Sequence, residues 1–317
     1  NTIVIKPSEL TPLATLKLVE VACDHLPAGV VNVVTGYGTE VGEPLVKHKD
    51  VPVIAFTGSL AVGQRIASLA GPMMKKLHLE LGGKDPMVIA PDAEMDMAVS
   101  GLAYSSLLNA GQVCTSTERV YVHESMIGQF SEELADFVSK LRLGNGLHEG
   151  TDIGPMIKNQ FREKVEGQIS DALGMGAKLL TGGKRPSGFD TGFFLQPAIL
   201  TNVNHQMRVM HEETFGPIIP LMSYKNFDEA IALANAAPGA DVIEFASGSG
   251  EAFEADAVIR LTQGQIEITE ALTINGSSAG GVLVITGDAN DDDVTVAGTD
   301  ITDVAASYVG TDDLLDD

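Results

Sequence analysis

The stretch NAGQVCTS at residues 109–116 lies between a run with helical periodicity at 98–108 and a strand-like run, RVYVH, at 119–123. Its cysteine, Cys114, is flanked by small and polar residues, which is not the environment of a core residue. Small neighbours leave room for a substrate, and a turn can aim backbone N–H groups at developing negative charge. The stretch therefore suggests a nucleophilic thiol at a turn between a helix and a strand.

A carboxylate that suits this thiol is Glu80, in HLELGGKDP at residues 78–86, where a strand-like run ends. A carboxylate and a thiol 34 residues apart suggest a general base and a nucleophile. Taken alone the pairing is unspecific, and the alternative for Glu80 is a strand-end carboxylate in a surface ion pair.

Strand-like and helix-like runs alternate along the chain, beginning with the β-branched run TIVI at 2–5. Such alternation predicts an α/β fold with a doubly wound parallel sheet and right-handed crossovers. In the helical run at 14–25, Cys23 lies on the apolar face, so we expect it to be a small core residue. Later helices are expected at 92–108, 125–141, 158–176 and 227–236.

Two further motifs, FTGS at 56–59 and EETFGP at 212–217, make the pattern specific. Together with the Glu80 and Cys114 segments, in this order and spacing, they resemble the aldehyde dehydrogenase superfamily. The resemblance covers residues 1 to about 236. It implies a partial doubly wound parallel-sheet aldehyde dehydrogenase fold, with a partial NAD-binding domain at 1–83 and a partial catalytic thiol domain at 84–236.

The chemistry that the resemblance implies is the oxidation of a small-molecule aldehyde to a carboxylic acid. Cys114 attacks the aldehyde carbon, hydride passes to the nicotinamide to leave a thioester, and Glu80 activates the water that hydrolyses it. Some relatives keep the fold without catalysis, as lens and scaffold proteins do. Retention of both Cys114 and Glu80 speaks against that alternative.

Small residues at the start of a helix, as in FTGS, favour phosphate binding, but the glycine fingerprint GxGxxG is only approximated by TGYGTEVG at 35–42. From the residues alone, a dinucleotide site and an ordinary strand-to-helix turn are equally open. The resemblance implies NAD, and a carboxylate beside the adenosine ribose would repel the 2′-phosphate of NADP. It assigns Lys6 and Glu9 to that ribose, Gly58 and Ser59 to the pyrophosphate, Glu213 and Phe215 to the nicotinamide ribose, and Leu81 and Gly82 to the same cofactor site. Glu213 could instead be an ordinary turn charge.

The net charge of −23 argues against nucleic acid and anionic membranes as partners. The charge is concentrated after residue 236, where one basic residue, Arg260, stands against 17 acidic ones. Residues 1–236 hold 19 basic and 26 acidic residues. This break predicts a change of module.

Residues 237–317 contain short β runs separated by Gly, Ser, Asn and Asp, which favours an all-β segment. The segment resembles secreted bacterial parallel β-helix repeat proteins. EAIALANA at 229–236 fits both families, so we expect a chimera in preference to a natural fusion. The competing hypothesis for the whole chain is a secreted β-helix adhesin-like protein carrying an enzyme fragment. DANDDD at 288–293 matches calcium-loop spacing only in its first positions, so we expect no metal site.

The resemblance also implies that parts of the enzyme lie outside this chain. The family's oxyanion asparagine and first strands precede the NTIVIK stretch at 1–6, and its oligomerisation strand follows residue 236. The parent family is homo-oligomeric and residues 1–236 imply a cytoplasmic parent. On these grounds we expect a fragment without measurable activity.

Overall fold

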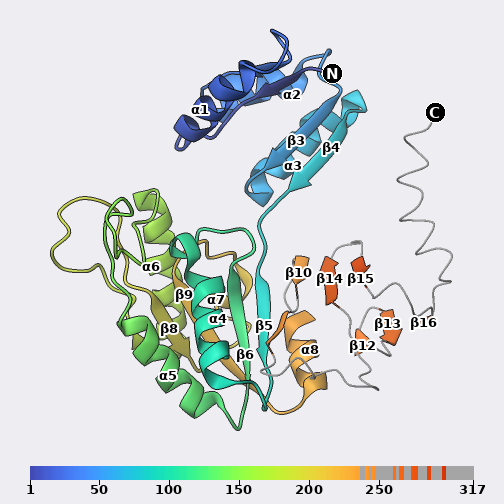
Figure 1. Ribbon diagram of the computed structural model, residues 1–317. Helices are drawn as coiled ribbons and strands as arrows, with labels where there is room; N and C mark the ends of the chain where they lie inside the picture. Colours follow the sequence, from blue (N-terminus) through green and yellow to red (C-terminus); the bar gives the residue numbers. More distant parts are fainter. Residues whose placement is uncertain are drawn as a thin grey trace. The chain divides into compact units, whose positions relative to one another are not determined.

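Residues 1–235 are described throughout by the computed structural model, and beyond them short strands are described at 240–242, 244–246, 260–261, 264–267, 273–277, 284–286 and 295–297. The chain divides into two compact units, Asn1–Gly82 and Gly83–Asp317. Each unit is considered by itself (Figure 1).

The first unit pairs its strands in two parallel ladders. β1 (Ile3–Ile5) pairs with β2 (Val31–Val33), and β3 (Val53–Thr57) pairs with β4 (Lys76–Glu80). Parallel neighbours need a crossover, and helices supply it in both cases. The helical segments of this unit are α1 (Pro12–Cys23), a π-helix η1 (Gly38–Gly42), α2 (Glu43–Lys47), α3 (Leu60–Ala70) and η2 (Gly71–Met73).

The β3–β4 ladder carries the small core of the first unit. Successive side chains of a strand point to opposite faces, and one face, with Phe56 and Leu79, packs against Ile66 and Ala70 of α3. The other face, which includes Thr57 and Glu80, is exposed. The functional carboxylate predicted at Glu80 therefore lies on the open face of this ladder.

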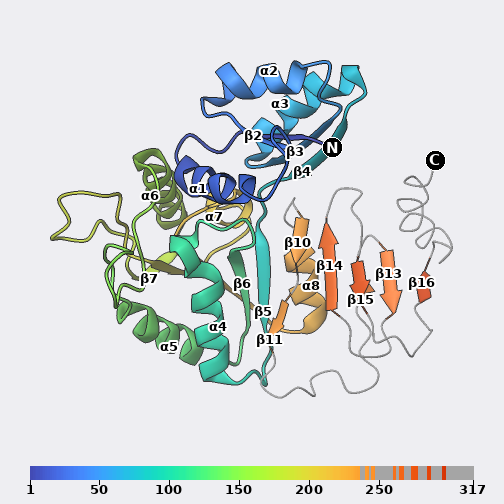
Figure 2. The ribbon, with the colours of Figure 1, turned by 45° about the horizontal axis from the view of Figure 1, so that its top comes forward.

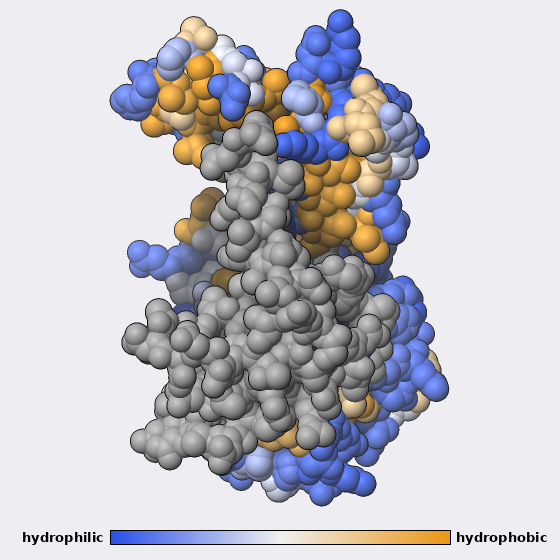
Figure 3. Space-filling model, turned by 90° about the vertical axis from the view of Figure 1, so that its right-hand side faces the viewer, coloured by the Kyte–Doolittle hydropathy of each residue, from blue (hydrophilic) through white to orange (hydrophobic). Residues whose placement is uncertain are grey.

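The expectation that Cys23 is a core residue is wrong. Cys23 is exposed, and α1 contains no buried residue. Within its unit α1 packs against β2 of a two-stranded ladder, which is too narrow to cover the helix. Figure 3 shows apolar side chains at the surface of this unit, and the most exposed on α1 are Leu13 at 78 % and Leu18 at 68 %. An apolar helical face is thus not sufficient to predict burial.

The second unit is built on a sheet with the strand order β11-β5-β6-β9-β8-β7. Its strands are β5 (Asp85–Ile89), β6 (Thr117–His123), β7 (Lys178–Thr181), β8 (Ala198–Thr201), β9 (Ile218–Tyr224) and β11 (Glu244–Ala246). All neighbouring pairs are parallel except β7 with β8. β7 departs from the predicted parallel sheet because no helix lies between it and β8 in the chain, so β8 returns antiparallel.

Helices cover both faces of this sheet, as Figure 2 shows for α4 and α5 on one side. One hydrophobic core lies between the sheet and these two helices and contains Val120 and Val122. A second core, on the other face of the sheet, contains Tyr121, the residue between them. This alternation along a strand produces three layers, and it confirms the α/β fold class over the first 235 residues. The helices are α4 (Met95–Leu107), η3 (Leu108–Gly111), α5 (Ile127–Ser139), α6 (Asn159–Gly174), α7 (Arg208–His211) and α8 (Phe227–Asn235).

Local capping explains where two of these helices begin. The Glu94 side chain accepts a hydrogen bond from the Met97 N–H at the start of α4. At the start of α8, Asn226 accepts from the Glu229 N–H while the Glu229 carboxylate accepts from the Lys225 N–H. This reciprocal pattern satisfies two amide groups that the helix leaves unpaired.

Beyond residue 235, the described strands pair mainly with one another. The antiparallel pairs are β10 (Ala240–Val242) with β14 (Thr273–Ser277), β12 (Arg260–Leu261) with β13 (Gly264–Glu267), β13 with β16 (Thr295–Ala297), and β14 with β15 (Val284–Thr286). The resemblance of residues 237–317 to a parallel β-helix stays a prediction. Among the described residues, no helix is long and apolar enough to cross a membrane.

Candidate active site

In the first unit, the predicted base and the predicted pyrophosphate turn meet at the carboxyl ends of β3 and β4. Glu80 is the last residue of β4 and lies opposite Thr57 of β3. The Gly58 N–H donates to the Glu80 carbonyl over 3.0 Å, and Ser59 is the N-cap residue of α3. The side chain of Leu81 packs over α3 at Gly63, where a Cβ would come within 2.5 Å of it. The structure thus brings Glu80, Gly58 and Ser59 together.

Lys6 lies at the end of the other ladder of this unit. Its half-buried ammonium group donates to the Pro7 carbonyl at 2.8 Å and to the Gly36 carbonyl at 3.1 Å. An ammonium group has three protons, so one remains for a ligand. Glu9 is exposed, and Gly82 is half-buried where the unit ends.

In the second unit, Cys114 is exposed in the connection between η3 and β6. The backbone before it is unusual: Asn109, Ala110 and Gly111 have φ values of 52°, 58° and 71°. Left-handed backbone is costly for residues other than glycine, and such strain concentrates at functional sites. Gln112 stabilises the turn, since its Nε2 donates to the Asn109 carbonyl and its Oε1 accepts from the Ile157 N–H.

Gly111 connects this turn to the EETFGP segment. A Cβ at Gly111 would lie 2.4 Å from the Gly216 carbonyl oxygen and 3.1 Å from the Pro217 nitrogen. Both neighbours are backbone atoms, so they cannot rotate away. The cysteine turn and the Glu213 segment therefore touch through their main chains at a position that requires glycine.

Gly111→Ala is expected to destabilise the second unit by roughly 2–4 kcal/mol, because it adds left-handed strain and a backbone clash. Chemical denaturation would measure the loss. Gly101→Ala is the matched control, since nothing lies within 4 Å of a Cβ there and α4 favours alanine. A Gly111→Ala protein as stable as the Gly101→Ala protein would contradict the contact.

Glu213 lies beside the cysteine segment as well, through Gly83. The backbone of Gly83 hydrogen-bonds to Glu213, and a Cβ on Gly83 would lie 3.4 Å from the Cys114 carbonyl oxygen. Burial raises the pKa of Glu213 above its usual value, and the nearby Glu118 carboxylate adds to the rise. Within the second unit, the structure thus gathers Cys114, Glu213 and Gly83 in one place.

Two charged residues at the centre of this cluster were missed from the sequence. Lys84 donates to Glu118 over 2.7 Å, and their side chains are 2 % and 4 % exposed. Glu118 also accepts the N–H groups of Thr214 and Phe215, at 2.7 and 2.8 Å. The available signal was a glutamate inside the strand TERVYV, because charged residues in a buried strand need a partner.

Arg119, the next residue, is fully buried and connects β6 to α8 and to the residue before β5. Its Nε donates to the Lys84 carbonyl at 2.7 Å, and its Nη1 donates to the Ala234 carbonyl in the last turn of α8 at 2.7 Å. Tyr121 adds a bond from its hydroxyl to the Leu233 carbonyl and lies 2.9 Å from His205 Nε2. Burial lowers the pKa of His205. These groups cap the end of α8.

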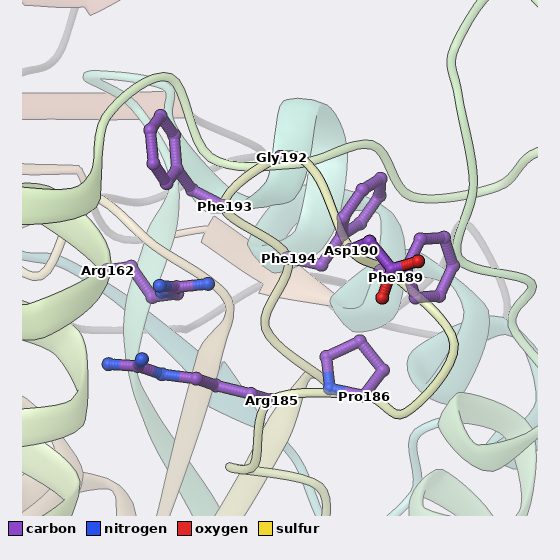
Figure 4. Close-up of a pocket in the computed structure, with 8 residues that line it drawn as sticks. All are labelled: Arg162, Arg185, Pro186, Phe189, Asp190, Gly192, Phe193 and Phe194. Carbon is purple, nitrogen blue, oxygen red and sulfur yellow. The ribbon is translucent and has the colours of Figure 1, made fainter.

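A pocket of about 390 Å³ lies elsewhere in this unit (Figure 4). It is lined by Arg162 of α6 and by residues between β7 and β8, including Arg185 and Phe189. Arg185 forms two hydrogen bonds with Glu166, at 2.6 and 2.7 Å, which neutralise its charge. None of the site residues predicted from the sequence lines this pocket.

In the part of the chain that the structure describes, no group of three or more His, Cys, Asp or Glu side chains could hold a metal ion. The acidic loop at 288–293 lies outside the described residues.

The comparisons assign the chain to a known enzyme family. The model of the aldehyde dehydrogenase family matches residues 1–282, and the chain belongs to that family. The matched range passes the break at 236, and β11 pairs with β5, so the change of module predicted there stays a prediction.

Sequence identity to individual aldehyde dehydrogenases supports this assignment. The chain is 42 % identical over 238 residues to betaine aldehyde dehydrogenase of Bacillus subtilis, covering 74 % of this chain and 49 % of that protein. It is 44 % identical over 234 residues to 3-sulfolactaldehyde dehydrogenase of Pseudomonas putida, with 74 % and 48 % covered. The chain thus spans about half the length of the curated relatives it matches.

Solved structures give the same result. The crystal structure of Staphylococcus aureus betaine aldehyde dehydrogenase in complex with NAD⁺ matches with a TM-score of 0.75 and 36 % identity, covering 78 % of this chain and 49 % of that one. An NADP-dependent enzyme of E. coli matches with a TM-score of 0.75 and 40 % identity, with 78 % and 52 % covered. Both nicotinamide cofactors therefore occur among the neighbours.

Proposed function

We propose that this chain carries the thiol and the base of an NAD-dependent enzyme that oxidises a small aldehyde to a carboxylic acid. The observation that carries the proposal is the position of Cys114. Its exposed thiol follows three left-handed residues, and the backbone of this turn is locked against the segment of Glu213. A nucleophile held on a rigid, strained turn is pre-organised for attack.

Cys114 acts as the nucleophile. Its sulfur forms a bond to the aldehyde carbon, and loss of hydride from the resulting thiohemiacetal leaves a thioester on the sulfur. Glu80 takes a proton from the water that cleaves the thioester, which releases the acid and restores the thiol. The exposed position of Glu80 at the end of β4 gives it access to water.

NAD supplies the hydride acceptor when it is bound. The residues present fit it: α3 begins with Gly58 and Ser59, which suits a pyrophosphate, and Lys6 keeps a free proton for a ribose oxygen. In the second unit, the half-buried Glu213 can accept from the hydroxyls of the nicotinamide ribose, with Phe215 beside it.

NAD is preferred to NADP in this proposal because Glu9 would repel a 2′-phosphate on the adenosine ribose. Glu9 is exposed and follows β1 closely, so its charge is available to a ligand at that strand end.

The experiment is an absorbance assay for NADH with the purified 317-residue protein, an aldehyde panel that includes betaine aldehyde, and NAD or NADP. The resemblance implies a fragment without measurable activity, whereas the exposed thiol on its strained turn leads us to propose aldehyde-dependent reduction of NAD that exceeds reduction of NADP. Reduction of NADP alone would contradict the cofactor assignment, and binding of neither dinucleotide in a calorimetric titration would contradict the function.

For residues 237–317 we propose a module with a separate origin, as the charge break suggests. Deleting them is then expected to leave the melting temperature of residues 1–236 unchanged within about 2 °C. A fall in melting temperature would also have a physical cause, because the deletion removes the pairing of Glu244–Ala246 with β5. A clear fall in melting temperature would therefore contradict the proposal.

A further inference from the structure

Lys84 and Glu118 form an ion pair that is almost fully removed from water, with a distance of 2.7 Å between Nζ and Oε2. Desolvation of two charges costs as much as their attraction returns, so a buried pair is weak evidence of stabilisation. Burial lowers the pKa of Lys84, and the Glu118 carboxylate partly offsets this. The pair therefore calls for an explanation beyond packing.

The hydrogen bonds of the pair converge on two residues between α7 and β9. Glu118 Oε2 accepts the Thr214 N–H at 2.7 Å, and Oε1 accepts the Phe215 N–H at 2.8 Å. Lys84 Nζ donates to the Thr214 hydroxyl at 2.8 Å. Both carboxylate oxygens are thus used, and a neutral side chain cannot reproduce the pattern, because a glutamine would direct an amide donor at one of the N–H groups.

The backbone that this carboxylate holds is strained. Phe215 has a φ of 53°, in the left-handed region that a bulky side chain rarely adopts. Successive N–H groups that point at one anion stabilise such a conformation. The residues on either side of Thr214 are Glu213 and Phe215, so the conformation of this backbone sets the direction of both side chains.

We propose that the Lys84–Glu118 ion pair is a positioning element that holds the 213–215 segment in the shape that receives the nicotinamide half of the dinucleotide. The inference rests on the proposed function, in which Glu213 and Phe215 contact the nicotinamide ribose. Neither Lys84 nor Glu118 touches the reacting atoms in this scheme. Their role is to fix the backbone between the two residues that do contact the cofactor.

The first measurement is amide hydrogen exchange in the full chain. In Glu118→Gln, the amide of Thr214 or Phe215 that faces the new side-chain NH₂ group is expected to exchange about 10- to 100-fold faster, because it loses a charge-assisted hydrogen bond. Asp152→Asn is the matched control, because Asp152 forms a similar carboxylate pair with Arg142 at an exposed site of the same unit. Unchanged exchange at both Thr214 and Phe215 in Glu118→Gln overturns the proposal.

The double variant Lys84→Met/Glu118→Gln separates positioning from stability and also serves if the single variant does not fold. Removal of both charges is expected to restore the melting temperature without restoring protection at both Thr214 and Phe215, since glutamine accepts from only one of the two N–H groups. If the double variant regains the melting temperature and the protection of both amides, the ion pair is only structural. That result would contradict the proposal.

The second measurement is the affinity for the two halves of the cofactor, by calorimetry. Glu118→Gln is expected to weaken binding of reduced nicotinamide mononucleotide at least 10-fold and to leave binding of AMP within about 2-fold. Equal loss for both ligands overturns the positioning role. If the unmodified chain binds neither ligand, the proposed function is wrong, and so is the role in cofactor binding assigned to the ion pair. The exchange data then still show whether the ion pair holds the 213–215 segment.

Discussion

Replacing Cys114 with alanine is expected to abolish aldehyde-dependent NADH formation, with a loss of roughly 10⁴-fold or more. Without the sulfur there is no covalent intermediate from which hydride can leave and no thioester for Glu80 to hydrolyse. The same substitution is expected to abolish the burst of p-nitrophenolate from p-nitrophenyl acetate. Acyl transfer to a thiolate needs no dinucleotide, so this second assay tests the nucleophile independently of the cofactor.

Cys23→Ala is the matched control for this prediction. Cys23 is also exposed, but it lies on α1 in the first unit. It is expected to retain both activities. Because both thiols are exposed, burial does not make their alkylation rates differ, and the substitution pair is the sharper test. A burst that survives Cys114→Ala and disappears in Cys23→Ala would overturn the nucleophile assignment.

Replacing Arg119 with methionine is expected to lower the free energy of unfolding of the second unit by about 3–5 kcal/mol. The guanidinium is fully buried, and its loss leaves the Lys84 and Ala234 carbonyls without this donor, as well as weakening the contact to the Tyr121 hydroxyl. Methionine fills much of the volume, so the loss reports mainly on hydrogen bonding. Chemical denaturation followed by circular dichroism would measure it.

Arg142→Met is the comparison for Arg119→Met. Arg142 holds both carboxylate oxygens of Asp152, but its side chain is 66 % exposed. Water replaces such a partner at little cost, so the denaturation midpoint is expected to change little. Equal shifts for the two arginine variants would mean that burial does not set the strength of these contacts.

The sequence was sufficient to predict most of the regular structure up to residue 235. The run at 158–176 predicted a helix that the structure forms at Asn159–Gly174, because a 3.6-residue period survives in any amphipathic helix. The antiparallel β7 was missed because strand direction depends on what connects the strands, which composition does not encode. The prediction that Cys23 is buried was wrong for a related reason, since an apolar helical face does not reveal which element covers it.

The candidate site was predicted in outline. Cys114, Glu213 and Phe215 were singled out by motif, and the structure gathers their segments, while their catalytic and cofactor roles stay predictions. Lys84 and Glu118 were not predicted, because the segment that they contact lies 130 and 97 residues further along the chain. Local patterns show that a strand carries a charge but not which distant backbone that charge will hold.

The parallel pairing of β6 with β9 also constrains how this protein is made. Val120 lies opposite Leu221, so the two central strands are roughly a hundred residues apart in sequence, a high contact order that slows folding. At ribosomal rates of about 5–20 residues per second, β6 waits roughly 5–20 s for its neighbour to be synthesised. During that time the half-sheet of β5 and β6, with α4 and α5, must survive with the position of its next strand empty. Slower translation between these strands is therefore expected to lower the yield of folded chain.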